Sequence, residues 1–287
     1  MKRTSTSRMV TLGALPVLAL ALSAFELPSH KDELFRYHNV LETSAGGDDM
    51  VVEYKPSRDY YGRDAVAGRK AKWRYVSKGI RWQRTSGTYK GGSGKLPVYV
   101  VGKSRKPRVA VVFVHGKNGS HRSGVRDVTV GGNFNRLQNI VAKGGGRYYS
   151  PTVSGFRADG VADMTALLAR IEREAPGAPV VLACTSTGAA LCLRLARNAT
   201  TKTQIDGLML LGGSWDDRAV GAADFPVVIG HGSKDKVYPL ARMHQFARDL
   251  RRGGQKVRFI EFRYGYHGTP LRMVDWRREL NWILAQG

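Results

Sequence analysis

The sequence predicts an α/β fold, with a mainly parallel central sheet and helices on both of its faces. Two observations lead to this prediction. Short apolar runs rich in β-branched residues alternate with longer amphipathic segments from about residue 108 to the end of the chain. The apolar runs are continuous, as in strands that are buried on both faces. The 34 glycines agree with a chain that makes many tight turns.

The elements follow in a regular order along the chain. Residues 73–89 and 96–102 alternate well enough to form an antiparallel, N-terminal hairpin around the glycine-rich turn at 91–94. The strands of the parallel part are expected at 108–114, 147–153, 179–183, 205–214, 225–232 and 256–262. Helices are expected at 133–142, 160–174, 191–197, 240–252 and 270–285. In such a sheet, reacting groups gather beyond the carboxyl ends of the strands.

The domain organisation is predicted as residues 1–24, 25–72 and 73–287. Lys2, Arg3 and Arg8 precede an apolar stretch at 9–22, and small residues follow it, so residues 1–24 resemble a cleaved signal peptide. The alternative is an uncleaved membrane anchor, for which the stretch is short. We therefore expect an exported protein, periplasmic or secreted. Residues 25–72 are polar and mixed in charge, and are expected to pack irregularly as an N-terminal arm on the 73–287 domain.

The charge of the chain is unusually positive. The formal net charge is +23, and +20 remains when the first 24 residues are removed. Such a charge indicates an anionic partner, either acidic lipid or a polymer of the cell envelope. No nucleic-acid-binding motif accompanies the basic residues, which argues against nucleic acid. The alternative is a solvated basic surface with no specific partner.

The two cysteines, Cys184 and Cys192, are not expected to pair. One ends a predicted strand and the other lies two turns into the next helix, so their side chains are expected to point apart. No Cys or His spacing typical of zinc is present, and we predict neither a metal nor a cofactor.

The segment around Ser186 is the most informative motif. The run from Pro179 to Ala183 reads as a strand, the segment from Leu191 reads as a helix, and Cys184-Thr185-Ser186-Thr187-Gly188 lies between them. A strand that turns sharply into a helix exposes the central side chain on a strained backbone. The pattern matches Gly-x-Ser-x-Gly except at its first position, where this chain has cysteine.

Two further residues stand just past predicted strands. Asp235 lies in His231-Gly232-Ser233-Lys234-Asp235, and His267 precedes the last helix. The order Ser, Asp, His resembles the α/β-hydrolase superfamily over residues 73–287, specifically its lidless, exported, serine esterase and lipase-like members. The turn at His115-Gly116 is a fourth matching feature.

The chemistry assigns a role to each residue. Ser186 is expected to be the nucleophile, His267 the base and acid, and Asp235 the group that orients the imidazole. The resemblance implies an oxyanion hole made by the N–H groups of Thr187 and Lys117. Structural readings remain open: Ser186 as a helix cap, Asp235 as a turn residue, and His267 as a surface histidine. Asp216 and Asp217 are the rival acids.

These residues predict a serine hydrolase that cleaves an ester, or else a thioester or amide, through an acyl-enzyme. The segment between Ser214 and Asp235 is too short for a large lid, so the site is expected to be open. The loop at 118–132, with His121, Arg122, Arg126 and Asp127, is expected to shape the pocket. An open site with these cations favours a sizeable or anionic ester over a small, buried one. The expected partner is therefore an ester substrate, either a small molecule or part of a polymer. The alternative function is a non-catalytic basic protein that binds the cell envelope.

Overall fold

The computed structural model describes residues 25–287, so the predicted signal peptide lies outside the described residues. The helices are α1 (Asp32–Phe35), α2 (Pro56–Asp59), α3 (Asn133–Lys143), α4 (Ala158–Glu174), α5 (Thr187–Arg197), α6 (Leu240–Arg252), α7 (Thr269–Met273) and α8 (Trp276–Leu284). The 3₁₀ helices are η1 (Ala45–Gly47), η2 (Trp73–Tyr75), η3 (Lys78–Gln83), η4 (Ser123–Val125), η5 (Val130–Gly132), η6 (Lys202–Gln204) and η7 (Asp217–Ala219). Among the described residues, no helix is long and apolar enough to cross a bilayer.

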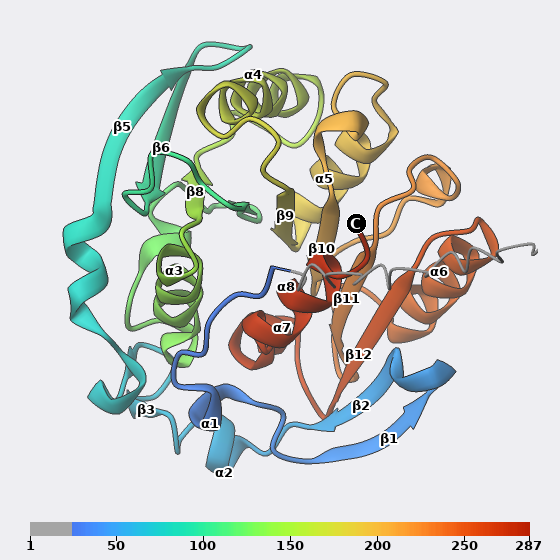
Figure 1. The fold of residues 1–287 in the computed structure, drawn as a ribbon. Helices are drawn as coiled ribbons and strands as arrows, with labels where there is room; N and C mark the ends of the chain where they lie inside the picture. The colour runs from blue at the N-terminus through green and yellow to red at the C-terminus, as the bar shows by residue number, and fades with distance from the viewer. Residues whose placement is uncertain (1–24) are drawn as a thin grey trace, which may run out of the picture.

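One sheet organises the molecule (Figure 1). Its strands are β1 (Val40–Ser44), β2 (Asp49–Glu53), β5 (Arg84–Lys90), β6 (Lys95–Val101), β7 (Ala110–Val114), β8 (Arg147–Pro151), β9 (Val180–Thr185), β10 (Gly207–Leu211), β11 (Val227–Gly232) and β12 (Val257–Arg263). They lie in the order β1-β2-β12-β11-β10-β9-β7-β8-β6-β5, and β3 (Asp64–Val66) pairs separately with β4 (Lys70–Ala71). The run from β2 to β8 is parallel, and both edges of the sheet are antiparallel. The predicted fold class is confirmed.

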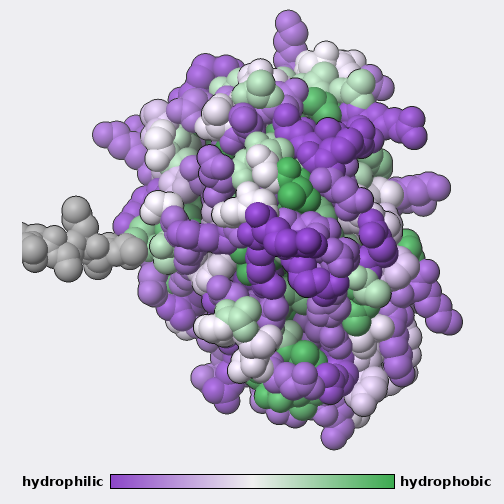
Figure 2. All heavy atoms as spheres, turned by 90° about the vertical axis from the view of Figure 1, so that its right-hand side faces the viewer, coloured by the Kyte–Doolittle hydropathy of each residue, from purple (hydrophilic) through white to green (hydrophobic). Residues whose placement is uncertain are grey.

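The sheet separates two hydrophobic cores, because alternate residues of each strand point to opposite faces. In β7, Val112 packs into the core under α4, α5 and α6, whereas Val111 and Phe113 pack into the core under α3, α7 and α8. Every residue of β7 is buried, which explains its continuous apolar sequence. The face in Figure 2, which is the right-hand side of Figure 1, is mainly hydrophilic with small, separate hydrophobic patches.

Two expected elements differ from the structure. Residues 73–83 form η2 and η3 rather than a strand, and the predicted hairpin is limited to β5 and β6. The reason is tertiary: these residues run along α3, where the Asn135 side chain accepts a hydrogen bond from the Ser77 N–H at 2.7 Å. The last predicted helix is two helices, α7 and α8, because Asp275 interrupts it and caps α8 through the Arg278 N–H.

The expectation that residues 25–72 pack irregularly is wrong for residues 40–53. These residues form the hairpin of β1 and β2, and β2 pairs in parallel with β12. Their polar sequence hides the pairing, because only Met50 and Val52 enter the core. Long-range pairing with the last strand, 200 residues away, decided the outcome.

Candidate active site

Ser186 stands between β9 and α5 on a strained backbone. Its φ is 52° and its ψ is −127°, a conformation that a residue with a side chain adopts only under constraint from its surroundings. Small neighbours supply that constraint. A Cβ added at Gly188 would lie 2.5 Å from the His115 carbonyl oxygen, and one at Gly116 would lie 2.9 Å from the Ser186 Cβ. Strand, turn and helix therefore approach too closely for larger residues, which explains the sequence motif.

The structure brings the three predicted catalytic residues together. His267 Nε2 lies 3.0 Å from Ser186 Oγ, and His267 Nδ1 lies 2.8 Å from Asp235 Oδ2. Because an ionised carboxylate only accepts hydrogen bonds, Nδ1 carries the proton and Nε2 is free to accept from the serine hydroxyl. The His267 side chain is about one-third exposed, whereas that of Asp235 is fully buried. The arrangement has the geometry of a nucleophile, a base and an orienting acid.

The Asp235 carboxylate is held by its own loop. Its Oδ1 accepts hydrogen bonds from the backbone N–H groups of Val237 (2.7 Å) and Tyr238 (3.1 Å). Burial raises the pKa of this carboxyl, but the hydrogen bonds from His267 and from the two N–H groups outweigh burial and hold the pKa below its ordinary value. Asp235 is therefore ionised, as an acid that orients an imidazole must be.

His231, near the end of β11, lies beneath this loop. It is fully buried, and its Nε2 donates to the Tyr238 carbonyl at 2.8 Å. The same nitrogen lies 3.6 Å from Asp235 Oδ2. Burial lowers the pKa of His231, so the ring stays neutral beside the carboxylate. It links β11 to the segment that positions Asp235.

The rival acids do not reach the imidazole. Asp216 accepts a hydrogen bond from Arg218 at 2.9 Å and lies 3.4 Å from Arg197. Asp217 pairs with Arg242 at 3.2 Å. Both carboxylates are therefore engaged by guanidinium groups on the outer side of η7. Of these three carboxylates, only that of Asp235 bonds to His267.

Of the two predicted oxyanion donors, Thr187 directly follows Ser186 in the chain, and Lys117 belongs to the turn after β7. Thr187 is the first residue of α5, where backbone N–H groups have no partner within the helix. Lys117 follows Gly116, which packs against Ser186.

The loop at 118–132 has more structural roles than expected. Asp127 is buried and binds Arg81 (2.7 Å) and Arg84 (2.8 Å), so it anchors the loop. His121 bonds the Thr152 hydroxyl and stacks on Tyr99. Arg122 and Arg126 are exposed.

Aromatic side chains that the sequence did not indicate lie beside the triad, which we define as Ser186, Asp235 and His267. The Tyr238 ring lies 5.6 Å from that of His267, and Trp215 packs edge-on against Tyr238. Trp215 lies two residues after the Gly212-Gly213 pair that follows β10, and a Cβ at Gly213 would lie 2.4 Å from the Ala189 Cβ on α5. Tertiary packing alone reveals this wall, because no periodicity distinguishes these aromatics from core residues.

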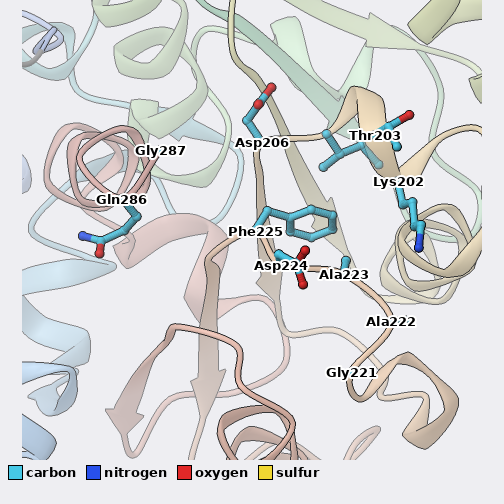
Figure 3. A pocket seen from close by; sticks show the side chains of 11 residues that line it. Lys202, Thr203, Asp206, Gly221, Ala222, Ala223, Asp224, Phe225, Gln286 and Gly287 are labelled. Atoms are coloured by element: carbon cyan, nitrogen blue, oxygen red, sulfur yellow. The ribbon is translucent and has the colours of Figure 1, made fainter.

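Two hollows need to be distinguished. One of about 360 Å³ adjoins His267; its lining includes Tyr54, Tyr60, Thr129, Val130, Tyr266 and Gly268. Another of about 420 Å³, in Figure 3, is lined by residues such as Asp206, Asp224 and Phe225, which precede β10 and β11. It therefore lies at the amino ends of the strands, at the edge of the sheet opposite the triad. The first hollow is lined by the residues on either side of His267 in the chain, whereas neither Ser186 nor His267 itself lines it.

Two expectations about the cysteines and the connections can be compared with the structure. Cys184 and Cys192 form a disulfide, with Cα atoms 6.6 Å apart, so the expectation that they do not pair is wrong. The helix runs back over the strand and stacks Cys192 above Cys184, a relationship that sequence spacing does not reveal.

The connection from β10 to β11 contains only η7, so no lid domain covers the triad. Within residues 25–287, no cluster of three or more His, Cys, Asp or Glu could hold a metal ion.

Comparison with known proteins identifies the fold. No family model matches the chain, and no curated protein matches it in sequence. Solved structures do match. A serine hydrolase without a lid from Xanthomonas campestris has 17% identity and a TM-score of 0.56, over 71% of this chain and 94% of its own. The Pyrococcus furiosus esterase has 9% identity and a TM-score of 0.56, over 74% and 96%. Esterase 2 of Thermogutta terrifontis, phosphonylated by cyclosarin, has 15% identity and a TM-score of 0.54, over 70% and 93%. The chain therefore has the α/β-hydrolase fold, as its sequence resemblance predicted.

Proposed function

We propose that this chain, which has the α/β-hydrolase fold, is a serine hydrolase that cleaves an ester through an acyl-enzyme on Ser186. One observation carries the proposal: His267 is within hydrogen-bond distance of Ser186 Oγ on one side and of the Asp235 carboxylate on the other. The three residues come from the ends of three strands, and the fold is shared with proteins described as serine hydrolases and esterases.

The chemistry proceeds in two stages. Ser186 Oγ attacks the carbonyl carbon while its proton passes to His267 Nε2, and the N–H groups of Thr187 and Lys117 stabilise the oxyanion. The intermediate collapses, the carbon–oxygen bond to the alcohol breaks, and the alcohol takes the proton from His267. Water then attacks the acyl group and gives its proton to His267, which returns it to Ser186 as the acid leaves. Asp235 stabilises the imidazolium in both stages.

The charges around the mouth favour an anionic substrate. Lys117, Arg122, Arg126, Arg157, Lys234 and Lys236 are exposed in loops at the carboxyl ends of the strands. Within residues 25–287, none of these six has a carboxylate within ion-pair distance, whereas Asp127, Asp216 and Asp217 are already paired. A mouth with excess positive charge attracts anionic esters and accelerates their encounter. We assign the substrate as an ester that bears negative charge, free or on a larger polymer.

We also propose that the protein acts outside the cytoplasm, in the periplasm or after secretion. The basic and apolar N-terminal sequence supports export. The disulfide between Cys184 and Cys192 supports an oxidising compartment, because cytosolic thiols are kept reduced in most organisms.

Covalent labelling by a fluorophosphonate tests the central proposal. The reagent should label the wild-type chain at Ser186, and Ser186→Ala should abolish both labelling and ester hydrolysis. Ser214→Ala, at the end of the neighbouring strand β10, is the matched control and should be labelled normally. Absence of labelling in a folded wild-type protein would contradict the proposal and favour a binding protein with a hydrolase fold.

A further inference from the structure

The positive charge of the chain is concentrated in one continuous part of the sequence. Residues 65–126 contain sixteen lysines and arginines and no aspartate or glutamate. This segment includes β5 and β6, at the left edge of Figure 1, whereas β1 and β2 at the opposite edge contain Glu42, Asp49 and Glu53. The molecule is therefore electrically asymmetric along its sheet. A basic edge of this kind meets an anionic partner in a defined orientation.

Two exposed tryptophans stand within this basic segment. Trp82 is 85% exposed and Trp73 is 54% exposed, which is unusual for the residue type with the largest apolar surface. Lys78 Nζ lies 4.4 Å and Lys70 Nζ 5.5 Å from the centre of the Trp73 ring. Lys78 and Trp82 both belong to η3. We define the indole face as the exposed residues Arg69, Lys70, Lys72, Trp73, Arg74, Lys78 and Trp82.

The indole face is held rigidly on the hydrolase domain. The Ala71 N–H donates to the Val128 carbonyl at 2.8 Å, and the Asn135 side chain bonds the Ser77 N–H. Arg81 of η3 pairs with the buried Asp127 at 2.7 Å. Exposed indoles on a fixed backbone lose little further freedom on binding, so they are suited to contact a partner.

The chemistry of the indole face favours a lipid surface. Indole rings prefer the headgroup layer of a bilayer, where one part of the ring is apolar and the N–H remains hydrated. Lysine and arginine beside them pair with anionic headgroups. Val66, 48% exposed, pairs with Lys70 across β3 and β4 and adds aliphatic surface, which a purely ionic polymer does not need. At 85% exposure, the Trp82 ring faces no groove wall that would enclose a polymer chain.

We propose that the indole face docks the protein on a membrane surface that contains anionic phospholipid. The loop at 118–132 adjoins this face through the Ala71–Val128 hydrogen bond. Docking therefore brings the edge of the sheet that carries Ser186 near the bilayer. The face lies outside the triad and its test requires no ester hydrolysis. Its failure is therefore distinguishable from failure of the proposed function.

Vesicle co-sedimentation with the full chain tests the proposal. Vesicles of phosphatidylcholine with phosphatidylglycerol should bind the protein, and pure phosphatidylcholine vesicles should bind it much more weakly. Trp73→Ala with Trp82→Ala should weaken binding to the mixed vesicles by about tenfold or more. Lys70→Gln with Lys78→Gln should weaken it about fivefold per cation. Every variant carries the same N-terminal residues, so these residues do not account for differences between the variants.

The control variant carries Lys103→Gln and Lys106→Gln, the same charge change in an exposed loop outside the indole face. It should lose clearly less binding than the Lys70 and Lys78 variant. Equal loss in the two would mean that net charge alone drives adsorption, and would overturn the proposal. A single-stranded oligonucleotide that binds more tightly than the mixed vesicles and depends on the two tryptophans would also overturn it, in favour of nucleic acid.

Discussion

Cys184 and Cys192 form a disulfide that joins β9 to α5 across the turn that carries Ser186. Both sulfur-bearing side chains are fully buried. The bond also explains why cysteine stands where the serine-hydrolase motif usually has glycine. A short covalent loop thus encloses the nucleophile and its strained backbone.

Loss of this disulfide should destabilise the protein. Cys184→Ala with Cys192→Ala should lower the free energy of unfolding by about 2–3 kcal/mol, since the cross-link no longer restricts the unfolded chain. Urea denaturation monitored by circular dichroism measures the change. A reductant should lower the free energy of unfolding of the wild type by a similar amount, and it should leave that of the double variant unchanged. Equal effects of reductant on both proteins would exclude the cross-link as the cause.

Gly188→Ala should disturb the nucleophile turn. The added Cβ would lie 2.5 Å from the His115 carbonyl oxygen and 2.7 Å from that of Val114, so α5 must move away from β7. Overpacking of this kind costs about 1–3 kcal/mol of stability, and the movement of Ser186 should lower kcat. Gly155→Ala, where no atom lies within 4 Å of the new Cβ, is the control and should change neither quantity.

The identity of the catalytic acid is testable by two matched substitutions. Asp235→Asn should lower kcat by about 10⁴-fold, because the amide no longer holds the imidazole in the productive tautomer. Asp216→Asn removes the same charge from a residue that binds Arg218 and Arg197 instead, and should leave kcat within a few-fold. Steady-state hydrolysis of a chromogenic ester measures both. If Asp216→Asn lowered kcat more than Asp235→Asn did, the catalytic acid would be Asp216, at the start of η7.

Salt should distinguish anionic from neutral substrates. Between low ionic strength and 1 M salt, kcat/KM for an anionic ester should fall by about tenfold or more, whereas kcat/KM for its neutral analogue should stay nearly constant. Lys234→Gln with Lys236→Gln, flanking Asp235, should reduce this salt effect, and Lys103→Gln with Lys106→Gln should not. Similar salt dependence for the two esters would remove the electrostatic argument for an anionic substrate.

Glu279 should make stability depend on pH. It is fully buried on α8, and burial raises its pKa to about 7 despite Arg258 at 3.3 Å. The folded state therefore binds this proton more tightly than the unfolded state does, where the pKa is 4.5. Its contribution is fully present below pH 4.5 and is lost as the pH rises through 7, a change of about 3 kcal/mol. Glu279→Gln should flatten this part of the stability profile, and exposed Glu172→Gln should leave it unchanged.

Much of the fold was predictable because its signals are local. The continuous apolar run at 110–114 and the small residues around Ser186 reflect burial and close approach that act on each segment directly. The three residues of the proposed site were identifiable because parallel strands present their carboxyl ends at one edge of the sheet. The structures of residues 40–53 and 73–83 were not predictable from the sequence. The reason is that β2 pairs with a strand about 200 residues away and that η3 follows the side of α3.

The sequence by itself determined the α/β class, the order of the main strands and helices from residue 108 onward, and the serine, aspartate and histidine that we propose for acyl transfer, since these follow from periodicity and from side-chain chemistry. Only the tertiary structure decided which acid meets His267, whether the two cysteines meet, and where the exposed tryptophans gather among cations. Those outcomes depend on distances between segments far apart in the chain, and such distances are set by packing of the whole domain.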